Sequence, residues 1–356
     1  YRPRFRYCHW SVSLAAGVGC LVVMFLIAPV WALVSIAAMA VIYRSIRVRE
    51  IRARWGDIRS GAFFERARRN LLALEEEEYH PKNWRPIVLA LSGAGWRRTH
   101  LAVYGHWLTA GHGILTLGQV IQGDIEDLTE RRHRQEDLIR DFIQEEGLQA
   151  FPAVCVADNL AEGIESLVQC HGLGALRANT LLLGWPSDPE RIQPFGSILR
   201  MVAGLRRSLI VARDVEESDN AWEIPQGTID VWWRGKANGP LMLLLAHLLT
   251  TNQPWRRHPI RLLRVAPSDA AVREMTSHLE ELIESSRITA TAHVVVAEAV
   301  PAAIQTTSRD AALVILGFEP PAEGSEIAFH SAMERLVGGL PRVLFVDSVG
   351  EVELDS

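Results

Sequence analysis

The sequence predicts an α/β protein in which an N-terminal transmembrane helical hairpin precedes two lobes, each built on a doubly wound parallel sheet. Two patterns indicate this fold. Residues 7–43 contain no Asp, Glu, Lys or Arg, and after residue 81 short apolar runs alternate with helical stretches. Such runs are typical of parallel strands that helices cover on both faces. The domains are therefore expected at residues 1–46 (hairpin), 47–80 (linker), 81–215 (first lobe) and 216–356 (second lobe).

The uncharged segment is too long for a single membrane helix. At about 1.5 Å per residue, residues 7–43 would form a helix of about 55 Å, whereas the hydrocarbon core measures about 30 Å. Pro29 lies near the middle, where it interrupts helical hydrogen bonding. Two spans of about 18 residues fit better, and the arginines at both ends place these ends in the cytoplasm. One long kinked helix and a buried core hairpin are the alternatives.

Residues 47–80 are predicted to form an amphipathic, arginine-rich helical linker. Residues 1–69 hold 12 arginines and only three acidic residues, a net charge of +9, while the rest of the chain carries −14. Contact of these arginines with anionic membrane lipids is one interpretation, and a solvated helix face is the other. Because no broad cationic surface is predicted after residue 69, nucleic acid is not expected as a partner.

The two lobes are predicted from two series of five strands. The first series has strands at 86–92, 113–121, 151–157, 179–185 and 208–214, and helices at 99–110, 126–146, 160–173 and 188–206. The second has strands at 228–233, 260–266, 290–298, 311–318 and 342–347, and helices at 239–252, 268–286, 299–308 and 325–338. The equal strand count suggests an internal duplication, and the polar residues 215–227 are expected to link the lobes.

The loop after the first strand contains the candidate phosphate site. Gly93 and Gly95 follow the strand, and Arg97 and Arg98 stand at the start of the next helix, where they could contact a phosphate. However, Arg98 replaces the third glycine of the GxGxxG fingerprint, so an ordinary tight turn with solvated arginines is the alternative. ATP would be the ligand of this loop, and no other cofactor is expected.

Residues that could support catalysis do not form a recognisable pattern. His100, His106 and His112 are spaced six apart, so they do not share the i,i+4 face that a helical metal site needs. The four cysteines have no CxxC spacing and are expected to be reduced thiols. Asp158 and Glu162 fit a helix N-cap followed by a first-turn acid. The chain is therefore not expected to be an enzyme or to hold a metal ion.

Five stretches of the sequence carry longer motifs. They are Trp55–Asp57, Asn83–Pro86, Phe151–Gly163, Gly172–Trp185 (GLGALRANTLLLGW) and Gly227–Trp233 (GTIDVWW), and the leucine-rich helix 241–249 follows them. In order and spacing they resemble the cation–chloride cotransporters, the sodium/potassium–chloride symporters of the amino acid–polyamine–organocation superfamily. The resemblance covers residues 1–275 well. After GTIDVWW the family usually continues with acidic residues and glycine, whereas this chain has Arg234–Gly239 (RGKANG).

The resemblance implies a cytosolic domain of two universal-stress-like lobes that forms a homodimer and regulates transport. The membrane spans that carry chloride with potassium and/or sodium would lie upstream of Tyr1, so no ion-binding residue is expected in this chain. The hairpin would be the last two spans, and the linker would join them to the cytosolic dimer. The protein would then be a multi-pass protein of the plasma membrane whose C-terminal domain lies in the cytoplasm.

A membrane-tethered nucleotide sensor of the universal-stress type is the alternative function. Such sheets bind ATP with a G-x2-G-x9-G-[ST] loop after the fourth strand. In this chain Gly184 is followed by Ser187, and the Gly196–Ser197 pair falls one position early. This departure argues against tight ATP binding, so the sequence favours the regulatory part of a symporter.

Overall fold

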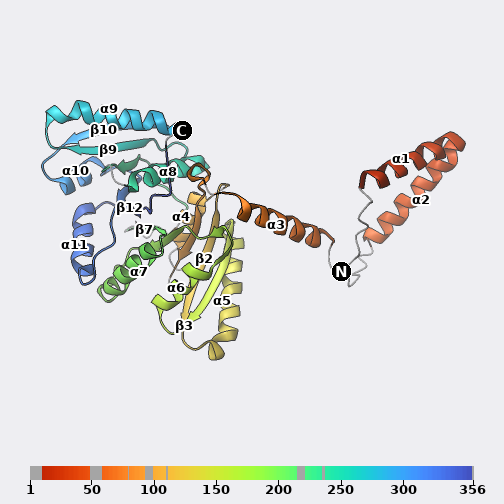
Figure 1. The fold of residues 1–356 in the computed structure, drawn as a ribbon, viewed down its shortest axis with the longest axis horizontal. Helices are drawn as coiled ribbons and strands as arrows, with labels where there is room; N and C mark the ends of the chain where they lie inside the picture. Colours follow the sequence, from red (N-terminus) through yellow and green to blue (C-terminus); the bar gives the residue numbers. More distant parts are fainter. Residues whose placement is uncertain are drawn as a thin grey trace. The chain divides into compact units, whose positions relative to one another are not determined.

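The computed structural model describes residues 10–48, 58–78, 80–92, 99–109, 111–214, 221–234 and 237–354. The chain divides into two compact units, Tyr1–Asn70 and Leu71–Ser356 (Figure 1). The first unit is helical, and the second contains all the strands that the structure describes. The boundaries expected at residues 46, 80 and 215 between smaller domains remain predictions.

The first unit begins with a pair of helices. α1 (Trp10–Ile27) and α2 (Pro29–Val48) are separated by Ala28 alone, and Pro29 opens α2, where its missing N–H costs no hydrogen bond. Within the described residues, no helix combines the length and the apolar character needed to cross a bilayer. The pair of helices is therefore confirmed, but the two predicted membrane spans are not found.

The predicted linker contains a shorter helix than expected. α3 spans Ile58–Glu76, and residues 49–57, which include the Trp55–Asp57 motif, lie outside the described part of the chain. Glu65 forms ion pairs with Arg68 at 3.1 Å and with Arg69 at 3.4 Å along the exposed helix surface. The predicted arginine-rich helix is thus present, with part of its charge neutralised on its own surface.

The strands of the second unit form one continuous ten-stranded sheet. In chain order they are β1 (Ile87–Leu91), β2 (Ile114–Gln122), β3 (Ala150–Ala157), β6 (Thr180–Gly184), β7 (Ser208–Asp214), β8 (Ile229–Trp232), β9 (Ile260–Ala266), β10 (Ala290–Val296), β11 (Leu313–Gly317) and β12 (Arg342–Asp347). Their spatial order is β10-β9-β8-β11-β12-β7-β6-β1-β2-β3. These bounds agree closely with the strands predicted from apolar runs.

The two halves of the sheet have the same topology. In each half the strands lie in the order third, second, first, fourth, fifth, and all neighbours within a half are parallel. This agreement supports the internal duplication inferred from the strand count. The halves meet at β7 and β12, which pair antiparallel from Leu209↔Asp347 to Asp214↔Arg342. The structure therefore differs from the expectation of one sheet per lobe: each half covers the free edge of the other.

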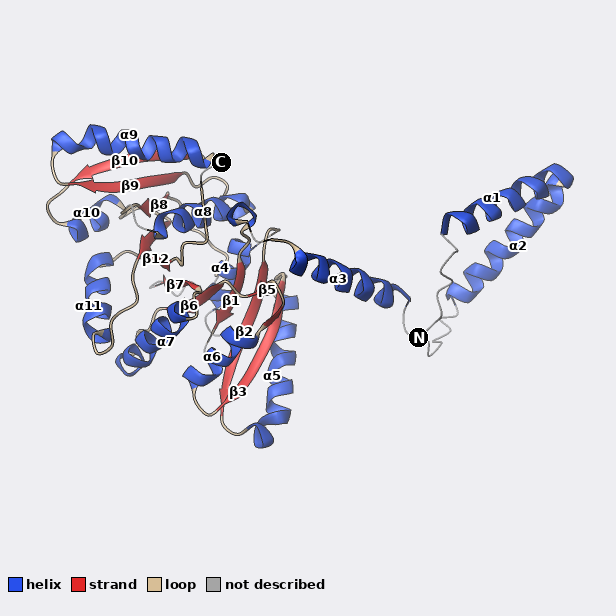
Figure 2. Ribbon diagram, in the orientation of Figure 1, coloured by secondary structure: helices blue, strands red, loops and turns tan. Residues whose placement is uncertain are grey.

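Helices cover both faces of the sheet (Figure 2). One face is packed by α4 (Thr99–Thr109), α5 (Ile125–Glu145), α8 (Asn238–Thr251) and α9 (Asp269–Ser286). The other is packed by α6 (Leu160–Cys170), α7 (Ile192–Gly204), α10 (Val300–Thr307) and α11 (Glu326–Val337). Each half gives its first two helices to one face and its last two to the other. The predicted doubly wound α/β architecture is confirmed, and each of the two hydrophobic cores runs through both halves.

A short hairpin replaces the end of the helix predicted at 160–173. α6 ends at Cys170, and β4 (Gly172–Leu173) pairs with β5 (Leu176–Arg177). Gly172 and Gly174 have φ angles of 119° and 53°, and residues with a Cβ rarely adopt this region of backbone space. The two glycines therefore end the helix and form the turn. The described part of the chain also contains the 3₁₀ segments η1 (Pro81–Asn83), η3 (Pro189–Arg191) and η4 (Gln253–Trp255).

Candidate functional site

The predicted phosphate-binding residues lie outside the part of the chain that the structure describes. Gly93, Gly95, Arg97 and Arg98 belong to residues 93–98, between the end of β1 and the start of α4. The phosphate site therefore remains a prediction.

Two other residues singled out in the sequence, His106 and Glu162, take part in packing and helix capping. Burial lowers the pKa of His106, whose ring packs edge-on against Trp222 with centroids 5.6 Å apart. Asn159, and not Asp158, caps α6: its Oδ1 accepts a hydrogen bond from the Glu162 N–H at 3.0 Å. Among the described residues, no three His, Cys, Asp or Glu side chains are grouped so that they could hold a metal ion.

The Gly196–Ser197 pair, compared above with the phosphate loop of universal-stress sheets, lies inside α7. Gly196 faces α11 so closely that a Cβ there would collide with the side chain of Glu326. Ser197 accepts a hydrogen bond from Arg200 at 3.1 Å. These two residues therefore contribute to helix packing.

The GTIDVWW motif forms β8 and encloses a buried polar network. Asp230 is completely buried, and Arg261 of β9 donates two hydrogen bonds to its carboxylate, at 2.7 and 2.6 Å. The hydroxyls of Thr228 and Ser308 also donate to this carboxylate, each at 2.6 Å. The hydrogen bond with Asp230 raises the pKa of Arg261, which therefore stays charged.

This network explains why the motif alternates polar and apolar residues. Asp230 and Trp232 lie on one face of β8, since side chains in a strand alternate between faces, and Thr228 directly precedes the strand. The Trp232 indole N–H donates to Ser308 at 3.0 Å and so closes the network beside α10. Gly227, with φ of 149°, leaves no room for a Cβ beside the backbone of Asp310 and Ala312. The motif therefore fixes the position of β8.

The GLGALRANTLLLGW motif also has a structural role. Asn179 precedes β6 and its amide donates to the Arg85 carbonyl at 2.7 Å, while its Oδ1 accepts from the Ile87 N–H at 3.0 Å. The Thr180 hydroxyl donates to the same Oδ1 at 3.0 Å. Asn179 thus holds the starts of β1 and β6 together, next to the Asn83–Pro86 motif.

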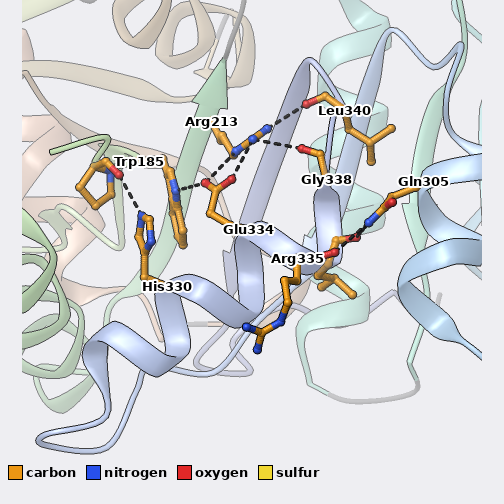
Figure 3. Close-up of polar contacts among 10 residues, drawn as sticks. Trp185, Arg213, Gln305, His330, Glu334, Arg335, Gly338 and Leu340 are labelled. Carbon is orange, nitrogen blue, oxygen red and sulfur yellow. Dashed lines mark hydrogen bonds and ion pairs between the residues drawn. The ribbon is translucent and has the colours of Figure 1, made fainter. Parts of the chain in front are cut away.

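Side chains from both halves meet at the junction, which we define as Trp185, Arg213, His330 and Glu334 (Figure 3). Arg213 of β7 donates to both carboxylate oxygens of Glu334 on α11, at 3.1 and 2.9 Å. It also donates to the carbonyls of Gly338 at 3.3 Å and Leu340 at 2.8 Å. The guanidinium of a first-half strand is therefore surrounded by acceptors from the second half.

Two aromatic rings complete the junction. The Trp185 indole N–H donates to Glu334 at 2.6 Å, and the His330 ring stacks on Trp185 with centroids 4.7 Å apart. His330 donates from Nε2 to the Pro186 carbonyl at 3.0 Å. Burial raises the pKa of Glu334, but the hydrogen bonds and charge of Arg213, with Trp185 and His330, outweigh it, so the net shift is downward. Glu334 is consequently ionised at neutral pH.

Two further ion pairs connect the halves near the junction. Arg200 of α7 contacts Glu326 of α11 at 2.6 Å and also donates to the Pro321 carbonyl at 3.3 Å. Arg342 of β12 contacts its strand partner Asp214 at 3.3 Å. Since each charged group faces a partner in the opposite half, these ion pairs connect the two halves of the sheet-containing unit.

A family model and two solved structures are similar to this chain. The family model described as solute carrier family 12 matches residues 98–217 and 218–333. The crystallised cytoplasmic domain of a prokaryotic cation chloride cotransporter is 20% identical and has a TM-score of 0.55, over 75% of this chain and 97% of that one. A universal stress protein from Archaeoglobus fulgidus is 12% identical, with a TM-score of 0.49 over 74% of this chain and 97% of that one.

The first of these structures shares the fold, and the TM-score of the second is too low to support an argument. The family model carries more weight, because its two matched segments cover well over half of the sequence. One segment contains most of the first half of the sheet, and the other contains most of the second half. The chain therefore belongs to solute carrier family 12.

Proposed function

We propose that this chain is the C-terminal part of a secondary active cation–chloride symporter, and that the sheet-containing unit is its cytosolic regulatory domain. The observation that carries the proposal is the match of the solute carrier family 12 model to both halves of the sheet. Similarity to the cytoplasmic domain of a prokaryotic cation chloride cotransporter, of which 97% is covered, supports it. The sites for chloride and for potassium or sodium would lie in membrane spans upstream of Tyr1.

The construction of the sheet suggests how such a domain would act. The antiparallel pairing of β7 with β12 and the ion pairs of the junction connect the two halves through backbone and side chains. A domain connected in this way moves as one body, because separating the halves would expose both strand edges and the charges of Arg213 and Glu334. A displacement of one half would therefore be transmitted to the other and, through the linker, to the membrane domain.

We further propose that the domain forms a homodimer. Light scattering after size-exclusion chromatography of the full chain in detergent would measure its mass. We expect twice the mass of one chain, and a monomer at all concentrations would contradict the dimer.

Contact of the linker arginines with anionic lipid belongs to the same proposal, and binding of the chain to vesicles with and without phosphatidylserine would test it.

A transport assay would test the main proposal. The symporter that includes this chain would be reconstituted in vesicles, and uptake of radioactive chloride would be measured with potassium, sodium or neither outside. We expect uptake that requires one of these cations and that changes in rate when residues 81–356 are deleted. Chloride uptake that is independent of both cations would exclude symport, and an unchanged rate after deletion would exclude regulation.

A further inference from the structure

The ten-stranded sheet ends in β3 on one side and in β10 on the other. Within the described residues, no further strand pairs with the outer edge of either one. Figure 2 shows β10 at its end of the sheet, beside β9 and α9. An unpaired edge presents a row of backbone N–H and C=O groups to which another chain can bind. Because β3 and β10 are the third strands of two halves with the same topology, their edges can be compared directly.

The outer edge of β3 is blocked by residues of this chain. The Gly123 N–H donates to the Ala157 carbonyl, so the odd-numbered residues of β3 face β2 and the even-numbered ones face outward. One outward residue, Pro152, has no N–H to offer. Arg132 of α5 donates from Nε to the outward carbonyl of Val154 at 3.1 Å. Proline and covering charged side chains are means by which natural sheets prevent pairing at an edge.

The outer edge of β10 has neither of these protections. The Ala297 N–H donates to the Ala266 carbonyl, so the odd-numbered residues of β10 face β9. The residues that face outward are Ala290, Ala292, Val294 and Val296. The strand contains no proline and no Asp, Glu, Lys or Arg. α9 packs on β10 as α5 packs on β3, yet within the described part of the chain it donates no hydrogen bond to this edge.

A second copy of this chain fits the open edge because the edge is self-complementary. Two copies of β10 related by a two-fold axis at His293 would pair antiparallel, with Ala290 opposite Val296 and Ala292 opposite Val294. All outward residues would then find partners, with about eight backbone hydrogen bonds. A register shifted by two residues would leave one outward residue of each copy unpaired. The side chain of Val296, which is 44% exposed, would lie beside Ala290 of the second copy.

The chain already contains one contact of this kind. Its two halves share one topology, and they meet where their fifth strands, β7 and β12, pair antiparallel. Antiparallel pairing between strand edges is therefore a contact that this fold makes internally. An unrelated protein would need an extended segment of matching sequence to occupy β10, whereas a second copy always supplies one.

We propose that the β10 edge is the surface through which two copies of this chain assemble, so that their two sheets become continuous. The inference rests on the homodimer proposed above and names its contact surface. The β3 edge remains unpaired in this assembly, since Pro152 and Arg132 block it.

A cysteine at the two-fold axis tests this surface directly. In the proposed register His293 lies opposite His293 of the second copy in a pair without backbone hydrogen bonds, where the Cα atoms are about 4.5 Å apart. A disulfide accepts Cα separations of about 4.4–6.8 Å. His293 is exposed, so its replacement removes no core packing. His293→Cys in the full chain in detergent should therefore form a covalent dimer under mild oxidation, seen on a non-reducing gel and reversed by dithiothreitol.

Thr291→Cys is the matched control, because Thr291 is also exposed and lies on the same face of β10. In the proposed register the two copies of residue 291 would be about 13 Å apart along the strands, too far for a disulfide. The unmodified chain, with its four native cysteines, gives the background. A yield of covalent dimer from His293→Cys that does not exceed this background, or an equal yield from Thr291→Cys, would overturn the proposal.

A proline at the open edge gives an independent test. Ala292→Pro removes an outward N–H and leaves the hydrogen bonds between β10 and β9 in place, so the thermal unfolding midpoint should change little. Light scattering should give the mass of one chain at a concentration where the unmodified chain gives twice that mass. Ala150→Pro makes the same change at the edge of β3 and should leave the mass unchanged.

The two tests separate this inference from the homodimer on which it rests. A dimeric Ala292→Pro variant would overturn the β10 edge as the contact surface and leave the proposed homodimer standing. A monomeric unmodified chain would overturn both. The crosslinking result does not depend on the stability of the proline variant, because it is obtained with a different substitution.

Discussion

Arg213 and Glu334 are 121 residues apart in the sequence and form a bidentate ion pair across the middle of the sheet, with N–O distances of 3.1 and 2.9 Å. Arg213 belongs to the last strand of the first half, and Glu334 to the last helix of the second half. The side chain of Arg213 is only 11% exposed. The pair therefore reinforces, through side chains, the connection that β7 and β12 make through their backbones.

Replacement of Glu334 tests the energetic importance of this connection. Glu334→Gln would leave the buried Arg213 without its counter-charge, and Glu334 itself is partly exposed, so solvent moderates the loss. We expect the free energy of unfolding to fall by about 1–3 kcal/mol in urea denaturation. Glu323→Gln, in the exposed loop before α11, is the matched control. Equal stability of the two variants would show that Arg213 is satisfied by the Gly338 and Leu340 carbonyls alone.

The buried carboxylate of the GTIDVWW motif should be the most sensitive acidic position. Asp230→Asn removes the charge that Arg261 neutralises and disrupts the hydrogen bonds from Thr228 and Ser308. Loss of one partner of a buried ion pair costs about 3–5 kcal/mol. We expect a loss of that size, measured by urea denaturation, whereas Asp158→Asn at an exposed position should cost almost nothing. A loss below about 1 kcal/mol would mean that Arg261 finds another acceptor.

The sequence was sufficient to predict most strands and helices of the second unit. Apolar runs such as Leu313–Gly317 are bounded by polar or turn residues, and buried parallel strands produce this pattern directly. The sequence predicts a helix that ends at residue 173, whereas α6 ends at Cys170. The helix ends earlier because Gly172 and Gly174 adopt positive φ angles. In the sequence, only these two glycines indicate the earlier end.

The arrangement of the halves and the interactions between them could not be read from local patterns. Pairing of β7 with β12 depends on two apolar strands more than 100 residues apart, and either could equally have been covered by another element. The contacts of Arg213 with Glu334 follow only from that pairing. One signal was available, however: Asp230 interrupts an otherwise apolar strand, and a buried carboxylate requires a cationic partner.

Asn179 provides a test of how the first half is assembled. Asn179→Ala would remove the acceptor of the Ile87 N–H and the donor to the Arg85 carbonyl at the start of β1. We expect a loss of about 1–3 kcal/mol, because these backbone groups would be left without their partner. Hydrogen exchange at the Ile87 amide should accelerate as well. Asn83→Ala changes an exposed asparagine in η1 and is the control. Unchanged slow exchange at Ile87 in the Asn179 variant would contradict the role of Asn179 as the acceptor that protects this amide.

Asp347 should make the stability of the protein depend on pH near neutrality. It ends β12, and burial, together with the negative charge of Glu319, raises its pKa to about 6. In the unfolded chain its pKa is about 3.9. The folded state therefore binds the proton more tightly, and the contribution of Asp347 to the free energy of unfolding increases as the pH falls from about 7 to about 4.

The variant Asp347→Asn isolates this contribution, because asparagine resembles the protonated acid. At pH 7 the variant should be more stable than the unmodified chain by on the order of 1 kcal/mol, a value reduced from the full shift because Asp347 is partly exposed. Below about pH 4 the difference should vanish, since both side chains are then neutral. Urea denaturation at several pH values measures this difference in stability.

Glu319→Gln should move the same pH dependence toward lower pH by removing the neighbouring charge, and Asp310→Asn at an exposed position should leave the pH dependence unchanged. A difference between the Asp347→Asn variant and the unmodified chain that stays constant from pH 4 to 7 would show that Asp347 titrates as an ordinary surface carboxylate.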